Sequence, residues 1–198
     1  TYIMGNAFWH IYPEAHVIVN YQLSNAMYCN IENMEVTDEM LEKVKAKMQE
    51  IISQDLKIEK KVMTREEAEK FYEETNSAKG RLQFDLEDRQ NINMYYCDDY
   101  YNYIYEVIAT HTGVTKIFDL KKYSNGFLLR YPSSKNVNVL PEFHETKKLL
   151  WALQEYETIY KVLNVGTVYR LNRAVKEDRI KYLILLSEAL HEKKISQI

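Results

Sequence analysis

The spacing of apolar residues changes along the chain and divides it into helical and extended stretches. Residues 2–12 carry apolar side chains three and four positions apart, the spacing of a helix that buries one face. Pro13 ends this pattern, because proline disfavours helical backbone in the residue before it. Residues 16–23 and 26–31 are rich in β-branched and aromatic side chains and are separated by a short polar turn, so they predict a β-hairpin.

Two later helix starts are marked by residues suited to capping. Thr37 is followed by two acidic residues, which complement the dipole of a predicted helix of about four turns. Residues 56–63 alternate as a strand. Thr64 and Glu67 have the spacing of a capping box, which predicts that a shorter helix begins there. Residues 77–90 are polar with scattered apolar positions and predict one further weak helix.

After residue 91 the chain becomes rich in aromatic and β-branched residues, which favour strands. The predicted strands are Ile92–Cys97, Tyr100–Ala109, Thr115–Leu120 and Gly126–Tyr131. Asn125-Gly126 is the strongest hairpin turn in the sequence, because both residues accept the backbone angles that tight turns require.

A polar, extended joint at residues 132–141 marks the predicted domain boundary. Beyond it, helical spacing returns in one long stretch and in two more that follow Gly166. We therefore predict an α+β fold, with a mainly antiparallel sheet and packed helices in residues 1–136. A helical segment occupies residues 137–198.

Composition and charge restrict the functions that the sequence supports. The formal net charge of −3 lacks the basic excess typical of nucleic-acid binders, so RNA binding is not expected. No apolar run is long enough to span a bilayer and no signal peptide is visible, so a cytoplasmic protein without membrane contact is predicted. Cys29 and Cys97 form no metal or redox motif, and we expect both to be buried, reduced thiols.

The residue patterns of common catalytic and metal sites are missing from the sequence. It contains 5 glycines and no G-x-x-x-x-G-K-[ST] motif, which excludes a usual phosphate-binding loop in this stretch. None of the histidines has an acidic or cysteine partner at ligand spacing. These histidines are His10, His16, His111, His144 and His191. We expect neither catalytic residues nor a metal or other cofactor in this stretch.

Tyrosine is unusually frequent, with 17 residues, and several fall in two adjoining predicted strands. We take Tyr95, Tyr101, Tyr103 and Tyr105, with nearby His111, as the candidate ligand-binding surface. Aromatic rings on a sheet can stack on a base or a sugar. They can equally pack against one another across strands, and this packing interpretation is the one that we favour.

Several segments, taken in order, resemble the second additional domain of threonyl-tRNA synthetases. They are the opening helix at residues 3–13, a hairpin at 24–29, a helix from residue 37, and strands around 118–120 and 125–127. The resemblance implies an antiparallel α+β fold. In that family the domain carries an editing site built from an H-x-x-x-H pair and a later C-x-x-x-H pair.

The editing residues of that family are replaced here. Tyr2 occupies the position of the second histidine, and the C-x-x-x-H positions correspond to Ile104 and Ile108. Isoleucine neither binds a metal ion nor transfers a proton. The resemblance therefore leads us to expect no metal and no aminoacyl-tRNA editing.

A bacterial uridine kinase-like family, which carries such a domain ahead of a P-loop kinase, resembles the chain still more closely. The resemblance rests on residues 103–105, 112–113, 116–121 and, most specifically, 186–195. It implies a non-catalytic accessory domain that binds the substrate, regulates the enzyme or forms a dimer. A separate C-terminal kinase domain would be its partner and would use ATP and Mg²⁺ to phosphorylate a nucleoside.

Two alternatives remain beside this interpretation. One is a degenerate tRNA-binding or editing-like domain related to threonyl-tRNA synthetase, and the other is a purely structural domain that forms a homodimer. Both ends of the chain look cut, which favours a piece of a larger enzyme.

Overall fold

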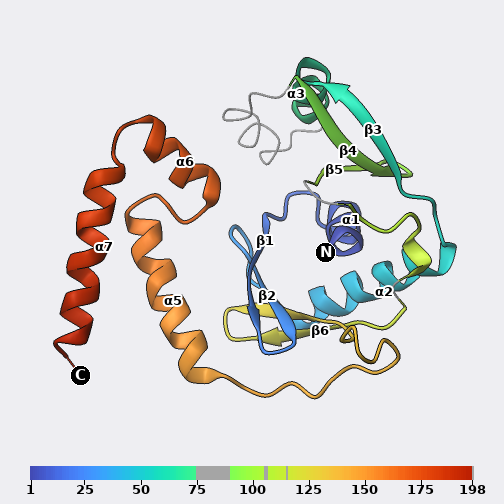
Figure 1. The fold of residues 1–198 in the computed structure, drawn as a ribbon. Coiled ribbons are helices and arrows are strands. Elements are labelled where there is room, and N and C mark those ends of the chain that lie inside the picture. Colours follow the sequence, from blue (N-terminus) through green and yellow to red (C-terminus); the bar gives the residue numbers. More distant parts are fainter. Residues whose placement is uncertain (75–89, 105–106, 115, 198) are drawn as a thin grey trace. The chain divides into compact units, whose positions relative to one another are not determined.

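The computed structural model shows an α+β fold with two antiparallel sheets and packed helices (Figure 1). It describes residues 1–74, 90–104, 107–114 and 116–197. Backbone packing divides the chain into two compact units, Thr1–Met63 with Asn91–Lys147, and Thr64–Gln90 with Lys148–Ile198. Within the described ranges, no helix has the length and apolar character needed to cross a membrane.

The larger sheet has the strand order β1-β2-β7-β6, and all its neighbouring strands are antiparallel. Its strands are β1 (Val17–Leu23), β2 (Ala26–Ile31), β6 (Asp119–Tyr123) and β7 (Gly126–Arg130). Both predicted hairpins are present, although the second turn is Ser124-Asn125, one residue earlier than predicted, and Gly126 begins β7. Each turn begins with a serine of positive φ, 52° at Ser24 and 55° at Ser124. The Tyr28 hydroxyl donates to Asn125 Oδ1 at 2.5 Å and so links one hairpin to the turn of the other.

Two helices, α1 (Tyr2–Ile11) and α2 (Asp38–Gln54), pack together beside this sheet (Figure 1). Their apolar faces and the sheet form the main core, which includes Phe8, Val44 and Phe127. The Thr37 cap is confirmed, because its hydroxyl accepts a hydrogen bond from the Met40 amide at 3.1 Å.

A second sheet has the order β3-β4-β5. It is formed by β3 (Glu59–Thr64), β4 (Asn91–Cys97) and β5 (Tyr100–Tyr103), and α3 (Arg65–Glu74) follows β3. The predicted capping box is present in both directions. The Thr64 amide donates to Glu67 Oε2 at 2.8 Å, and the Glu67 amide donates to Thr64 Oγ1 at 3.2 Å.

The predicted strand Tyr100–Ala109 is too long. β5 ends at Tyr103, and the described residues that follow pair elsewhere. The Ile58 amide donates to the Thr110 carbonyl at 2.7 Å, and the Thr112 amide donates to the Leu56 carbonyl at 2.9 Å. These bonds join this segment, which includes the short helix η1 (Thr112–Val114), to the residues just after α2 instead of extending the sheet.

Two other predicted elements differ from the structure or lie beyond it. The strand predicted from residue 115 begins only at Asp119. The weak helix predicted at 77–90 lies outside the described residues, apart from residue 90. The joint after β7 is irregular, as expected, and Arg130 donates to the Pro141 carbonyl at 2.9 Å and so ties this joint back to the strand.

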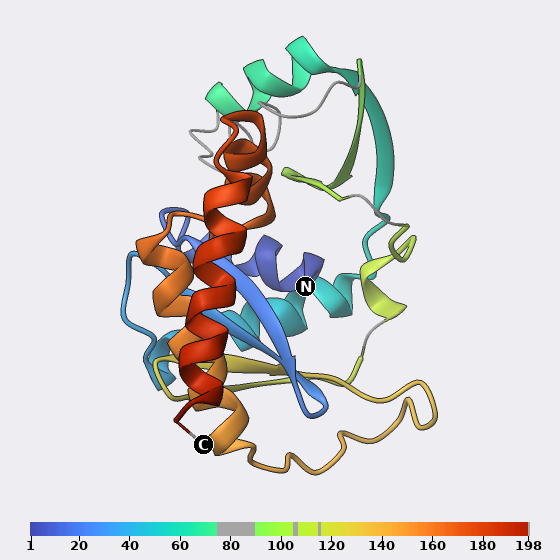
Figure 2. The same cartoon turned by 60° about the vertical axis from the view of Figure 1, so that its left-hand side comes forward.

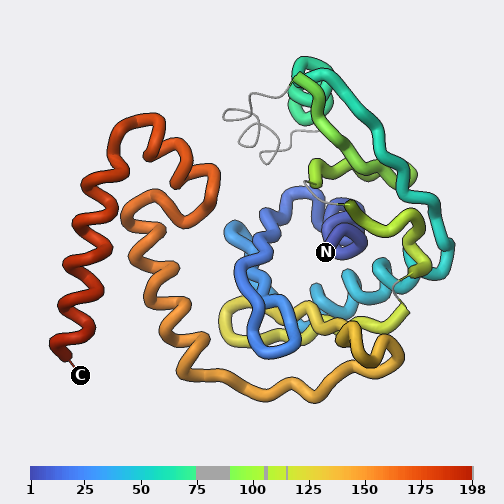
Figure 3. The backbone as a smooth tube through the Cα atoms, viewed as in Figure 1, coloured from blue at the N-terminus to red at the C-terminus, as the bar shows by residue number. Residues whose placement is uncertain are grey.

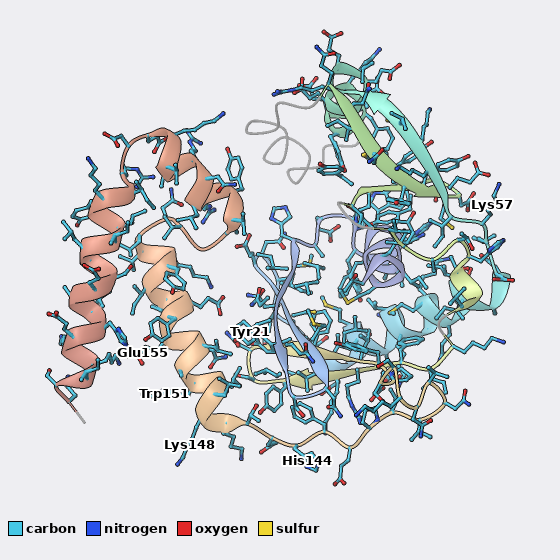
Figure 4. All side chains as sticks on the ribbon, in the orientation of Figure 1. Tyr21, Lys57, His144, Lys148, Trp151 and Glu155 are labelled. Carbon is cyan, nitrogen blue, oxygen red and sulfur yellow. The ribbon has the colours of Figure 1, made fainter. Side chains whose placement is uncertain are left out.

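Three helices follow the joint, α5 (Lys147–Val162), α6 (Val168–Lys176) and α7 (Ile180–Ile195). The chain reverses direction through α6, so that α7 runs back along α5 (Figures 2 and 3). Lys194 of α7 forms an ion pair with Glu155 and lies 6.0 Å from the ring centroid of Trp151. Figure 4 labels both partners, which lie one turn apart on α5.

Candidate functional site

The candidate site lies where α1 meets the hairpin of β4 and β5. Tyr2 and Trp9, on one face of α1, contact Tyr100, with ring centroids 5.3 Å and 5.9 Å from that of Tyr100. Gly5 lies between them on the same face. A Cβ atom at Gly5 would lie 2.6 Å from the Tyr100 hydroxyl oxygen, so only glycine permits this approach without displacing the tyrosine.

Tyr2 is held by its hydroxyl as well as by its ring. The hydroxyl points to two backbone carbonyls, those of Tyr100 at 3.2 Å and Tyr95 at 3.4 Å, and donates to them. Burial is the largest cause of a pKa for Tyr2 far above the ordinary value of a phenol. The side chain is therefore neutral and its proton is already engaged, which leaves it no role as a base.

Two isoleucines complete this cluster, which we call the filled cleft. Ile104 and Ile108 pack against the buried residues Tyr2, Ile58, Tyr95, Cys97 and Tyr100. The three positions that the resemblance assigned to editing ligands, 2, 104 and 108, are thus brought together. They meet as packed side chains with no free donor for a metal ion.

Burial raises the pKa of both thiols in the chain. Cys97 is fully buried, and burial, followed by the neighbouring charges of Asp98 and Asp99, raises the pKa of its thiol. Cys29 is likewise buried and free, and burial raises the pKa of its thiol to about 12. In the described parts of the chain, no three metal-binding side chains come together.

A polar contact at the edge of the filled cleft could not be found from the sequence. His10 Nε2 lies 3.2 Å from Asp99, and His10 Nδ1 lies 2.9 Å from the Asn6 carbonyl. The ring therefore connects α1 to the turn between β4 and β5. Neither residue has a local signal for this pairing, since 88 residues separate them in the sequence.

The predicted tyrosine surface is not formed as one face. Tyr95 and Tyr103 are buried, whereas Tyr101 is half-buried and stacks on Tyr96 with ring centroids 5.2 Å apart. Tyr95 faces α1, and Tyr101 points to the opposite side because neighbouring side chains alternate across a strand. Tyr105 lies outside the described residues.

His111 is also separate from these tyrosines. It is exposed and forms an isolated backbone bridge with Lys57, whose side chain points away from the ribbon (Figure 4). Among the described members of the predicted surface, Tyr95 and Tyr103 are buried in packing, and His111 lies apart from the tyrosines. Ligand binding by these residues stays a prediction.

Known proteins similar to this chain are threonine–tRNA ligases. The enzyme of Clostridium kluyveri is 30% identical over 129 residues, which are 64% of this chain and 20% of the ligase. That of Fusobacterium nucleatum subsp. nucleatum is 24% identical over 130 residues, 64% of this chain and 21% of the ligase. The ligase of Methylobacillus flagellatus is 25% identical over 183 residues, 91% of this chain and 27% of the ligase. No family model matches the chain.

These similarities correct one expectation and support another. The chain spans about a fifth to a quarter of the length of the ligases that it matches. The uridine kinase assignment, with its nucleoside kinase and transferase activities, is wrong, because the similar proteins are threonine–tRNA ligases and not uridine kinases. ATP and Mg²⁺ were expected through that assignment alone. The resemblance to threonyl-tRNA synthetase is supported.

Proposed function

We propose that this chain is a tRNA-directed binding domain that does not hydrolyse aminoacyl esters. The observation that supports RNA as the ligand is the similarity to threonine–tRNA ligases over 129 residues. What supports binding without hydrolysis is the filled cleft, where Tyr2, Ile104 and Ile108 pack together.

Ester hydrolysis needs a group that activates water or the carbonyl. A metal ion would do so as a Lewis acid, and a histidine or carboxylate would do so as a general base. The filled cleft offers a neutral phenol hydrogen-bonded to two carbonyls, two isoleucines and a buried thiol of raised pKa. The histidine at its edge, His10, has both ring nitrogens engaged, by Asp99 and by the Asn6 carbonyl. None of these groups takes a proton from water near neutral pH.

RNA binding is tested by retention of labelled, unfractionated tRNA on filters with the 198-residue chain at 50 mM and 200 mM salt. Contacts to phosphates release counterions, so we expect affinity to fall steeply as salt rises, by about tenfold or more for three or more contacts. An excess of unlabelled tRNA should displace the label. Retention that is absent, or that is the same at both salt concentrations, would contradict the proposal.

The absence of hydrolysis is tested separately with aminoacyl-tRNA. The rate of ester loss with the chain present should equal the spontaneous rate, while a threonine–tRNA ligase with an intact H-x-x-x-H pair serves as the positive control. An accelerated rate that depends on the concentration of the chain would show a residual hydrolase, and the non-hydrolytic part of the proposal would be abandoned.

A further inference from the structure

Helix α6 has two opposite faces, of which one is apolar and the other is basic. Val168 and Leu171 lie on the apolar face and line a cavity of about 520 Å³ together with residues of α7. Arg170, Arg173 and Lys176 are three residues apart and fall within an arc of about 120° on the other face, since successive residues of a helix turn by about 100°. The basic face therefore points away from the cavity.

The same spacing continues past the end of the helix. Arg179 follows after three more residues, and Lys181 lies in the first turn of α7. We call Arg170, Arg173, Lys176, Arg179 and Lys181 the basic stripe. Residues 167–182 hold these five basic side chains and only two acidic ones, which gives a local excess of three positive charges in a chain whose net charge is −3.

One of the acidic residues organises the stripe. Glu177 accepts hydrogen bonds from Arg173 Nε at 3.0 Å and from Arg179 Nε at 3.0 Å, one on each carboxylate oxygen. The carboxylate therefore holds two guanidinium groups side by side. Both stay accessible, with side chains 58% and 42% exposed.

The other three cations have no acidic partner among the described residues. Arg170, Lys176 and Lys181 form no ion pair with any described carboxylate. Two tyrosines accompany them, since Tyr169 is half-buried on the basic face of α6 and Tyr182 is 65% exposed. Cations at regular spacing beside accessible aromatic rings are the features that bind a nucleic-acid strand, because the cations contact phosphates and the rings stack on bases.

We propose that the basic stripe binds the phosphate backbone of RNA. This inference rests on the proposed function and names the surface that would bind the tRNA. Guanidinium groups match phosphate oxygens in paired, planar hydrogen bonds, and Glu177 holds those of Arg173 and Arg179 side by side. The alternative occupant is an acidic protein helix. Such a helix would be expected to bury apolar side chains against an apolar surface, but the apolar cavity lies behind α6 and no residue of the basic stripe lines it.

The test replaces the three unpaired cations in one variant of the 198-residue chain, with Arg170→Gln, Lys176→Gln and Lys181→Gln. A matched control carries Lys60→Gln, Lys61→Gln and Lys135→Gln, which remove the same charge from exposed residues of the other unit. Filter binding of labelled tRNA is measured between 50 mM and 200 mM salt, and thermal unfolding by circular dichroism checks that both variants fold.

We expect the stripe variant to bind tRNA about 10- to 100-fold more weakly at 50 mM salt. Its plot of log affinity against log salt should be flatter by about two to three units, because each lost phosphate contact removes about 0.7 to 0.9. The control should keep the wild-type slope. Poly-glutamate, a probe for an acidic protein partner, should compete poorly with tRNA.

The failures are distinguishable. A wild-type chain that does not bind tRNA would overturn the proposed function and the stripe together. If the wild type binds and both variants lose affinity equally, net charge alone matters and the stripe is overturned, while RNA binding stands. Poly-glutamate that competes as well as tRNA would overturn the stripe as an RNA surface in favour of an acidic protein partner.

Discussion

The unit built on the larger sheet and the three C-terminal helices use their apolar residues in opposite ways. In the first, Leu23, Phe127 and Leu128 are completely buried, as are several members of the core beneath α1 and α2. Few apolar side chains of α5, α6 and α7 are buried, and these are Leu150, Ala174 and Leu183. Large side chains such as Trp151 and Tyr182 remain about two-thirds exposed.

The difference predicts that stability and the proposed binding depend on different regions. In the first unit even the positions associated with chemistry, such as Tyr2 and Ile108, have become part of the packing. On the helices, charged and aromatic side chains stay at the surface, where a ligand can reach them. We therefore expect substitutions in the first unit to act on the free energy of unfolding, and substitutions on the helices to act mainly on binding.

The largest contrast is expected for aromatic residues of the two regions. Phe127→Ala removes a fully buried ring and should lower the free energy of unfolding by about 3–5 kcal/mol. Trp151→Ala removes a ring that is 66% exposed and should change it by less than about 1 kcal/mol. Urea unfolding followed by far-ultraviolet circular dichroism measures both. Equal losses would remove the distinction between the two regions.

A glycine in each region gives a second contrast. A Cβ atom at Gly126 would lie 2.2 Å from the Cys29 carbonyl oxygen, a backbone atom, so Gly126→Ala should destabilise the sheet by about 1–3 kcal/mol. At Gly166 the nearest atom would be 3.8 Å away and the φ angle is not positive. Gly166→Ala should therefore be neutral or stabilise by up to about 1 kcal/mol. If Gly166→Ala lowers the urea midpoint more than Gly126→Ala does, the close contact assigned to Gly126 would be refuted.

A smaller effect should come from one hydroxyl in each region. Tyr2→Phe keeps the ring but removes the donor to the Tyr95 and Tyr100 carbonyls, which should cost about 1 kcal/mol. Tyr182→Phe removes an exposed hydroxyl and should leave the unfolding midpoint unchanged. If the two variants unfold alike, the hydroxyl of Tyr2 contributes nothing to the filled cleft.

The smallest effect is a dependence on alkaline pH that belongs to the sheet unit alone. Burial raises the pKa of Cys29 to about 12, whereas an unfolded thiol titrates near about 8.5. The neutral thiol therefore contributes stability that is complete below about pH 8.5 and is lost as pH rises toward 12. Between pH 8 and 9 this loss is below about 1 kcal/mol. The urea midpoint should therefore fall slightly over that range, and less so in Cys29→Ala. If the urea midpoints of the wild type and Cys29→Ala fall equally with pH, the burial of the Cys29 thiol would be contradicted.

The local part of the fold could be predicted from the sequence, because its signals lie a few residues apart. The caps at Thr37 and Thr64 and the turn before Gly126 are of this kind. The end of β5 could not be predicted. The sequence of residues 104–109 predicts a strand, but Thr110 and Thr112, which follow, bond to the segment after α2 and not to the sheet.

The candidate site was predictable only in pieces. The resemblance singled out positions 2, 104 and 108, but no spacing in the sequence shows that they pack together. The link between His10 and Asp99 joins distant segments without a local pattern. The basic stripe has a visible spacing of three residues, yet the whole-chain charge concealed it, because acidic residues elsewhere offset the local excess.

The double attachment of Tyr2 also restricts how this domain can evolve. A histidine at position 2 would remove both the ring that packs on Tyr100 and the hydroxyl that reaches two carbonyls of the hairpin. Ile104 and Ile108 would still supply no ligand, so a histidine at position 2 alone would cost stability and create no metal site.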